Sequence, residues 1–371
     1  MFANIDTPAL LLDAAKVERN CRRMRERVQG HGLVLRPHVK TAKSVEVTQI
    51  ALDAPTGAIT VSTLREAEYF VDHGFRDILY AVGMVPAKVA RIAELVRRGA
   101  RMSAIVDSVE AARALVDASG RANVRIPTLV EMDSDGHRAG IPPGNRRLFA
   151  VAEVLGESLL GLMTHAGDSY NCDSTDAIRQ VAARERDAVV NGAAALRARG
   201  HACPVVSVGS TPTATFADSF AGVTEVRTGV YMFHDLVMAG LGVCALDDIG
   251  ISVLASVIGQ QRDKNWILTD AGWMAMSRDR GTANQKVDQG YGLVCDASGL
   301  PVDDLIVTDA NQEHGIVARR DGGPIDFTRY PIGALLRILP NHACATAAQH
   351  AEYHVLRDGR MTETWDRFGG W

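Results

Sequence analysis

Short apolar runs alternate with longer stretches of helical periodicity through the first two-thirds of the chain. Each apolar or β-branched run is followed by a polar or glycine turn, and then by about ten to fifteen residues with apolar positions at helical spacing. This pattern predicts strands at residues 33–36, 58–62, 78–82, 103–106, 128–132, 161–164, 204–208 and 224–227. It predicts helices between them, among others at residues 62–73, 86–98, 108–119 and 175–199.

Eight strand–helix units within about 230 residues are typical of a TIM barrel, whose catalytic groups lie at the carboxyl ends of the strands. After about Leu246 the pattern changes to short alternating runs, at residues 251–257, 266–269, 305–307 and 335–339, which predict β structure. We therefore expect an α/β protein with a (β/α)8 barrel at residues 1–245 and a mainly β C-terminal domain at residues 246–371. A doubly wound sheet is the alternative, but no Gly-x-Gly-x-x-Gly motif follows an early strand.

Composition and charge limit the partners of the protein. Hydrophobic residues make up 47% of the 371 residues, and 40 Lys and Arg against 44 Asp and Glu give a net charge of −4. No basic block is long enough to follow a phosphate backbone, so nucleic acid is not an expected partner. The sequence has no signal-peptide pattern and no uninterrupted apolar stretch of membrane-spanning length, so a membrane is not expected either. Six cysteines without a Cys-x-x-Cys pair indicate a reducing compartment, and we expect a cytoplasmic protein without disulfides.

The first predicted strand runs into a segment with three cationic or imidazole side chains. Strand alternation puts Arg36, His38 and Lys40 on one face, which points inward in a barrel. A lysine at the mouth of a barrel would be desolvated and close to other cations, which lowers the pKa of its amine and suits it to form a Schiff base. The alternative is a strand-end lysine that simply reaches solvent.

The last two strands of the predicted barrel each end in a turn of small residues. Ser210 and Thr211 follow the seventh strand, and Gly229 and Tyr231 follow the eighth. TIM barrels commonly hold a phosphate at these two turns, where backbone amides close on the anion. Either turn alone is explained as an ordinary βα connection, but the two together indicate a phosphorylated cofactor.

Two further segments contain residues that suit a cofactor or a metal. His342 and Cys344 form a His-x-Cys motif, and extended backbone would put both side chains on one face as a zinc-type pair with open coordination positions. A cysteine that merely fills the core is the alternative. His165 and Tyr170 follow the sixth strand, where they would either lie near a bound ring or pack in the core.

These segments together resemble a known family. The Pro37–Lys40 segment, the two turns and the His-x-Cys motif are similar to those of fold-type III pyridoxal-phosphate enzymes, in the branch of D-serine dehydratases and D-threo-3-hydroxyaspartate dehydratases. The resemblance covers essentially the whole chain and implies an alanine-racemase-like barrel with a carboxy-terminal β domain, in a homodimer. D-threonine aldolases of the same superfamily carry an acidic residue in place of the cysteine, so His342-Ala343-Cys344 favours the dehydratase branch.

The resemblance also implies roles for individual residues. Lys40 would form the Schiff base and act as the catalytic base, and His342 and Cys344 would bind a divalent metal, with zinc favoured over manganese or magnesium. The implied residues that bind pyridoxal 5'-phosphate are Lys40, His38, His165, Tyr170, Ser210, Thr211, Gly229 and Tyr231. The implied substrate is a D-3-hydroxy amino acid, which loses water and then ammonia to give a 2-oxo acid. D-serine would give pyruvate and D-threo-3-hydroxyaspartate would give oxaloacetate, and the sequence does not choose between them.

Three other functions are compatible with parts of this pattern. A retro-aldol lyase of the D-threonine aldolase type would use the same lysine and metal but release glycine and an aldehyde. An amino-acid racemase would need a second base, for which Tyr291 is the candidate. A non-catalytic pyridoxal-phosphate carrier would lack the β domain. For a second substrate carboxylate, the candidate cations are Arg36, Arg138, Arg278 and Arg280.

Overall fold

A computed structural model describes Phe2 and residues 5–371, and within it the chain divides into two compact units. The first unit contains Arg22–Gly229 with Gly370–Trp371, and the second contains the chain up to Cys21 together with Val230–Gly369. The structural division therefore lies between Gly229 and Val230 rather than at the expected residue 245. The N-terminal strand also belongs to the second unit, because its hydrogen-bonding partners lie there.

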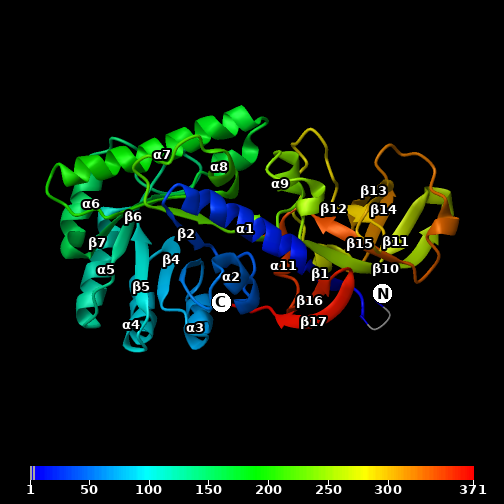
Figure 1. The fold of residues 1–371 in the computed structure, drawn as a ribbon, viewed down its shortest axis with the longest axis horizontal. Helices are drawn as coiled ribbons and strands as arrows, with labels where there is room; N and C mark the ends of the chain where they lie inside the picture. Colours follow the sequence, from blue (N-terminus) through cyan, green and yellow to red (C-terminus); the bar gives the residue numbers. More distant parts are fainter. Residues whose placement is uncertain (1, 3–4) are drawn as a thin grey trace. The chain divides into compact units, whose positions relative to one another are not determined.

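The first unit is built on a parallel sheet of eight strands in the order β2-β9-β8-β7-β6-β5-β4-β3. Figure 1 labels β2, β4, β5, β6 and β7 among them. The outer strands of this sheet, β2 and β3, are joined by an isolated parallel bridge between His38 and Thr60, so the sheet is nearly closed. The predicted TIM barrel is confirmed, and all eight predicted strands are present. Their bounds are β2 (Val34–Pro37), β3 (Ala58–Val61), β4 (Asp77–Gly83), β5 (Arg101–Val106), β6 (Thr128–Met132), β7 (Leu159–Thr164), β8 (Val205–Val208) and β9 (Glu225–Thr228).

Helices connect the strands of this sheet, and several begin where the sequence predicts. Thr63, Ser108 and Ser174 each cap a helix by accepting a hydrogen bond from the backbone N–H three residues later, which satisfies a donor that the helix itself leaves unpaired. The helices are α1 (Ala14–Gly30), α2 (Val45–Leu52), α3 (Leu64–Asp72), α4 (Val89–Arg97), α5 (Val109–Arg121), α6 (Arg147–Leu155), α7 (Thr175–Arg197) and α8 (Thr211–Phe216). The division between the two units falls inside α1.

The second unit is built on a mainly antiparallel sheet in the order β11-β14-β13-β12-β15-β10-β1-β16-β17. The strand β1 (Ala9–Asp13) pairs antiparallel with β10 and parallel with β16. The other strands are β10 (Ile251–Gln261), β11 (Trp266–Thr269), β12 (Gly292–Cys295), β13 (Pro301–Ala310), β14 (Gly315–Arg319), β15 (Leu335–Pro340), β16 (Glu352–Arg357) and β17 (Arg360–Asp366). The four predicted runs correspond to β10, β11, β13 and β15, whereas the remaining five strands were not predicted.

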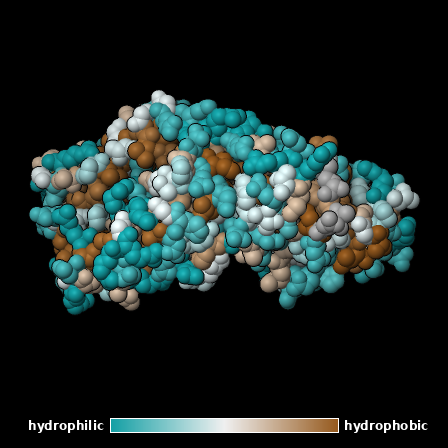
Figure 2. All heavy atoms as spheres, turned by 60° about the horizontal axis from the view of Figure 1, so that its bottom comes forward, coloured by the Kyte–Doolittle hydropathy of each residue, from teal (hydrophilic) through white to brown (hydrophobic). Residues whose placement is uncertain are grey.

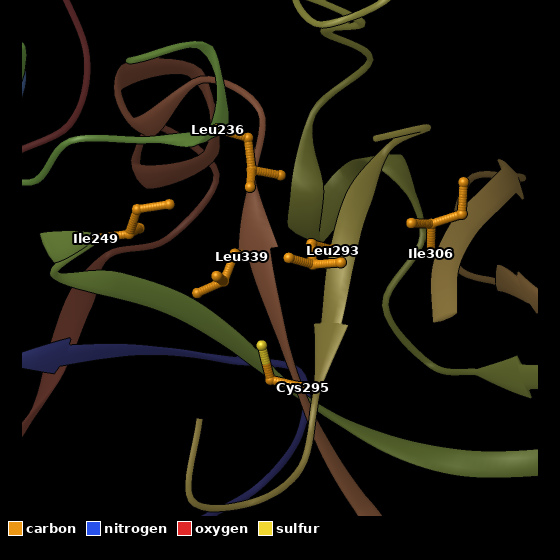
Figure 3. Packing of buried hydrophobic residues seen from close by; sticks show 6 residues of the cluster. All are labelled: Leu236, Ile249, Leu293, Cys295, Ile306 and Leu339. Carbon is orange, nitrogen blue, oxygen red and sulfur yellow. The ribbon is translucent and has the colours of Figure 1, made fainter. Parts of the chain in front are cut away.

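A buried apolar cluster supports the short helices of the second unit. Figure 3 shows its side chains, which come from α9 (Leu236–Gly240), β12, β13, β15 and the segment before β10: Leu236, Ile249, Leu293, Cys295, Ile306 and Leu339. Removing these side chains from water stabilises the packing of α9 against the strands. Leu339 lies near the end of β15, so the cluster also fixes the backbone that leads into α11 (Ala343–Ala347).

The face drawn in Figure 2 is covered mostly by hydrophilic side chains, with apolar ones in separate groups between them. Among the described residues, we find no helix with both the length and the apolar character that a membrane crossing requires.

Candidate active site

Four of the segments that the sequence singled out lie at the carboxyl ends of barrel strands. His38 and Lys40 follow β2, His165 follows β7, Ser210 follows β8 and Gly229 follows β9. These strands are parallel and belong to one sheet, so their carboxyl ends form one rim of the barrel. The structure therefore brings the predicted cofactor-binding residues of the first unit to the same rim.

Lys40 lies in the turn after β2 and is exposed. The strand ends at Pro37, so the amine is presented by a turn rather than by the inward face of a strand, as the alternation had predicted. The prediction that residues of the barrel desolvate the amine of Lys40 is therefore wrong. The turn itself is fixed at both sides, because His38 N donates to Thr228 O (2.8 Å) and Val39 N donates to Thr60 O (2.9 Å).

Two uncharged imidazoles lie near Lys40. The Nδ1 atom of His38 is buried and has no hydrogen-bond partner among the described residues. Burial, together with the positive charges of Lys40 and Arg227, holds the pKa of His38 well below its usual value. Burial also lowers the pKa of His165 to about 3. The ring nitrogen Nδ1 of His165 lies 2.8 Å from Gly209 O, and since a carbonyl only accepts, Nδ1 carries the proton and Nε2 is an acceptor.

Tyr170 lies in the 3-10 turn Gly167–Asn171 that follows β7. Its ring centroid is 6.2 Å from that of His165, with an angle of 43° between the ring planes. This distance is within the range of favourable aromatic contacts. The two rings that the sequence placed together are therefore neighbours in the structure.

The hydroxyl groups of Ser210 and Thr211 are buried and bonded within the protein. Ser210 Oγ accepts from Thr213 N (3.2 Å) at the start of α8 and bonds Ser169 Oγ (2.8 Å). Thr211 Oγ1 bonds Thr228 Oγ1 at the end of β9. Both hydroxyls therefore hold the turns of neighbouring strands together.

Two glycines let these turns approach one another closely. A Cβ atom on Gly209 would lie 1.6 Å from Arg227 O, and one on Gly229 would lie 2.6 Å from His38 O. Only glycine fits where two backbones come this close. Tyr231, which the sequence grouped with Gly229, is buried in the 3-10 turn Val230–Met232 and belongs to the second unit.

A chain of buried polar side chains crosses the barrel below this rim, and sequence reasoning missed most of it. Arg227 Nε donates to Ser207 Oγ (2.8 Å), which donates to Glu225 Oε1 (2.8 Å). Glu225 Oε2 accepts from Arg36 Nε (2.6 Å), and Arg36 also pairs with Asp77 (2.7 Å). The sequence did carry a signal for this network in β9, a strand that is buried at all four positions and in which Glu225 and Arg227 are two residues apart.

The His-x-Cys motif of the second unit is formed by the start of a helix. β15 ends at Pro340, His342 is the N-cap residue of α11, and Cys344 lies in its first turn. The prediction that extended backbone aligns the two side chains is therefore wrong, although the pair is formed. Burial alone would lower the pKa of His342, but hydrogen bonds with Asp279 and Cys344 raise it to about 11.

Two carboxylates that the sequence did not indicate hold this motif. Asp279 Oδ2 lies 2.6 Å from His342 Nδ1, which leaves Nε2 as the ring nitrogen for a ligand. Asp235 accepts from Ala343 N (2.9 Å) and from Met238 N (2.9 Å). Burial raises the pKa of Asp235 to about 6. Neither carboxylate has a local sequence signal, because each lies far from the motif along the chain.

A metal at this motif would have two protein ligands. In the part of the chain that the structure describes, no group of three or more His, Cys, Asp or Glu side chains is arranged to hold a metal ion. An imidazole and a thiol are donors that zinc prefers, and two ligands leave positions open for water or substrate. The donor set therefore fits a catalytic metal better than a structural one.

The candidate cations for a second substrate carboxylate differ in their present partners. Arg36 is held by two carboxylates, as described above, and Arg138 pairs with Glu131 (3.2 Å). Arg280 pairs with Asp288 (2.7 Å) and lies over the ring of Tyr291, the candidate racemase base. Arg278 lies 4.4 Å from the centroid of the tryptophan ring of α10 (Trp273–Met276).

The barrel with its lysine-bearing rim, followed by an antiparallel β unit, defines a protein of the alanine racemase fold. Residues 12–236 match the family model for the alanine racemase N-terminal domain, and residues 250–356 match that for a putative serine dehydratase domain. The chain belongs to this family, in the group of D-threo-3-hydroxyaspartate and D-serine dehydratases, and it is an enzyme of the lyase class.

Relatives are similar over almost their whole length. The chain is 51% identical to D-threo-3-hydroxyaspartate dehydratase of Delftia sp. (strain HT23), over 99% of this chain and 98% of that one. It is 32% identical to D-serine dehydratase of Dictyostelium discoideum, over 96% and 94%. A cysteine variant of D-threo-3-hydroxyaspartate dehydratase, solved in the metal-free form, matches with a TM-score of 0.97 and 50% identity over 99% of both chains. A histidine variant of that dehydratase, also with a TM-score of 0.97 and 50% identity, covers 99% of this chain and 96% of its own. The two substituted positions lie two residues apart, which is the spacing of His342 and Cys344.

Proposed function

We propose that this enzyme converts D-threo-3-hydroxyaspartate to oxaloacetate and ammonia, using pyridoxal 5'-phosphate and a divalent metal. The observation that carries the proposal is the barrel rim on which Lys40, His38, His165, Ser210 and Gly229 converge. The 51% identity to a dehydratase of this substrate supports the choice of reaction. The metal-free form of a cysteine variant of that enzyme supports the metal.

The residues of the rim fit pyridoxal phosphate. Lys40 offers an exposed amine for covalent attachment, and His38 has a buried Nδ1 atom without a partner among the described residues. His165 and Tyr170 offer ring faces beside it, and the backbone amides of the turns at Ser210–Thr211 and at Gly229 would hold the phosphate. When bound, the cofactor supplies an aldehyde for the amino group and a ring that delocalises the electron pair left by the α-proton.

Lys40 is the residue we assign to proton transfer. Its Nζ atom would accept the α-proton of the bound substrate. The low pKa values of His38 and His165 keep both imidazoles uncharged at neutral pH.

His342 and Cys344 would hold the metal, with zinc favoured. A metal held there would supply Lewis acidity to the β-hydroxyl of a substrate within its reach, which is a poor leaving group without it. Asp279 orients the imidazole through Nδ1, and Asp235 holds the amide between the two ligands. Loss of water and hydrolytic loss of ammonia balance to one oxaloacetate and one ammonia per substrate, with no net consumption of water.

A product assay tests the proposed function and separates it from the alternatives. Purified enzyme with pyridoxal phosphate and Zn²⁺, Mn²⁺ or Mg²⁺ would be given D-threo-3-hydroxyaspartate, D-serine or D-threonine. We expect oxaloacetate from the first substrate, with a kcat/KM above that for D-serine, because a site built to hold a polar group discriminates against a substrate that lacks it. Glycine and an aldehyde would instead indicate the aldolase reaction. No 2-oxo acid under any of these conditions would refute the dehydratase.

We further infer that the enzyme is a cytoplasmic homodimer. The dimer is supported by the family resemblance, and the location is supported by six cysteines that form no disulfide among the described residues. Light scattering should give twice the mass of one chain. A fully active monomer would contradict the inference.

A further inference from the structure

A buried carboxylate on α7 has no part in the chemistry described above. The side chain of Glu185 lies in the middle of this helix, and the residue is only 2% exposed. Burial raises its pKa, while hydrogen bonds and the charge of Arg227 act in the opposite direction. A carboxylate placed among buried aliphatic residues is costly unless hydrogen bonds compensate it.

Those hydrogen bonds come from the turns that follow two neighbouring barrel strands. Glu185 Oε1 accepts from Gly209 N (2.9 Å) after β8 and from Ala166 N (3.2 Å) after β7. Its carboxylate also bonds the side chain of Thr213 in the first turn of α8. One side chain therefore joins two turns that the β-sheet hydrogen bonds do not connect.

The backbone of Gly209 is held by hydrogen bonds at both its N–H and its carbonyl. Its N–H donates to Glu185, and its carbonyl accepts from His165 Nδ1 (2.8 Å). The Cβ position of Gly209 is filled by the backbone of Arg227 at 1.6 Å, so the turn cannot move toward β9 without collision. These contacts fix the backbone of Gly209 and, with it, the start of the Ser210–Thr211 turn.

We propose that Glu185 is a positioning residue that sets the Ser210–Thr211 turn in its phosphate-binding position before the cofactor arrives. The inference rests on the proposed function, because that function assigns the turn to the phosphate of pyridoxal phosphate. A preformed turn binds more tightly because its ordering cost is paid during folding rather than on binding. The position of the carboxylate oxygen, rather than its charge, holds the turn in place.

Two conservative substitutions separate geometry from charge. Glu185→Asp keeps the charge but withdraws the oxygens by about 1.5 Å, the length of one carbon–carbon bond, so Oε1 no longer reaches both amides. Glu185→Gln loses the charge but keeps a carbonyl oxygen at Oε1, and the Thr213 hydroxyl can rotate to accept from the new amide. Val189→Ala is the matched control, because Val189 is buried on the same helix one turn later and bonds neither turn.

The measurement is pyridoxal phosphate binding to each purified apoenzyme at matched folded fraction. The ³¹P shift of the bound phosphate and amide hydrogen exchange over residues 205–216 provide local readouts. We expect Glu185→Asp to bind at least about tenfold more weakly, with a changed ³¹P shift and faster exchange; tenfold is about 1.4 kcal/mol. This free energy is at the lower end of the cost of leaving one buried amide N–H without a hydrogen-bond partner. Glu185→Gln should stay within about threefold of wild type, and Val189→Ala should lose thermal stability but keep its affinity.

The outcomes separate this inference from the proposed function. If wild type binds pyridoxal phosphate and Glu185→Asp binds it as well as Val189→Ala does, the positioning role is refuted and the proposed function stands. If Glu185→Gln is as weak as Glu185→Asp, the negative charge is needed as well as the oxygen position, and the inference that geometry alone sets the turn is refuted. If wild type binds no pyridoxal phosphate, the proposed function fails and takes this inference with it.

Discussion

Asp279→Asn is expected to weaken metal binding without removing a metal ligand. The carboxylate Oδ2 lies 2.6 Å from His342 Nδ1, so it fixes the ring and leaves Nε2 for the metal. Loss of such a partner commonly costs about 10- to 100-fold in metal affinity. The side chains of His342 and Asp279 are 43% and 34% exposed, so water can replace part of the lost bond. We therefore expect the lower end of that range, about tenfold, or about 1.4 kcal/mol.

Cobalt titration of the metal-free enzyme measures this effect directly. The thiolate–cobalt absorbance in the near ultraviolet reports bonding to Cys344, and competition with a chromogenic chelator gives the affinity. Asp288→Asn is the matched control, since Asp288 is a half-exposed carboxylate that pairs with Arg280 at 2.7 Å. Unchanged affinity in Asp279→Asn, or an equal loss in Asp288→Asn, would refute the assigned orienting role.

Three further perturbations have defined expected results. Lys40→Ala should abolish both the imine absorbance of reconstituted enzyme and turnover, while cobalt binding at Cys344 persists; retained turnover would exclude Lys40 as the base. Gly209→Ala forces a Cβ to 1.6 Å from Arg227 O, so urea unfolding should show a loss of about 3 kcal/mol or more, and an unchanged midpoint would contradict the packing. His165, with a folded pKa of about 3 against 6.5 when unfolded, binds fewer protons in the folded state between those values, so stability should fall as the pH falls through this window. The loss of stability is at most about 1.4 kcal/mol per pH unit. It should be absent in His165→Gln, which keeps a donor for Gly209 O. Equal slopes of stability against pH in both proteins would refute the assignment to His165.

The barrel was predictable because each of its strands carries its own local signal. Parallel strands covered on both faces read as continuous apolar runs, and β6 is buried at every position. The antiparallel unit was harder. β1 is a short apolar run whose partners, such as Leu254 for Ala9, lie far along the chain, and no local pattern reveals that pairing. The place of β1 in the second unit was missed for the same reason.

The site was predictable where a motif carries the chemistry itself. Lys40 and the turn at Ser210 follow strands, and strand ends meet at one rim in any such barrel. What the sequence could not supply was side-chain packing across elements. Asp279 and Glu185 act through hydrogen bonds to distant residues, and the exposure of Lys40 depends on where β2 ends.

The pairing of β1 has a consequence for the order in which the protein can mature during synthesis. All strands of the barrel lie between Val34 and Thr228, so all of them can leave the ribosome before most strands of the second unit are made. β1 emerges first of all, yet its two neighbours are made only after Ile251 and Glu352 have been added. The N-terminal strand therefore stays unpaired until β10 is made, and its second partner, β16, follows only after Glu352. The sheet that supports His342 and Cys344 is thus completed after the barrel.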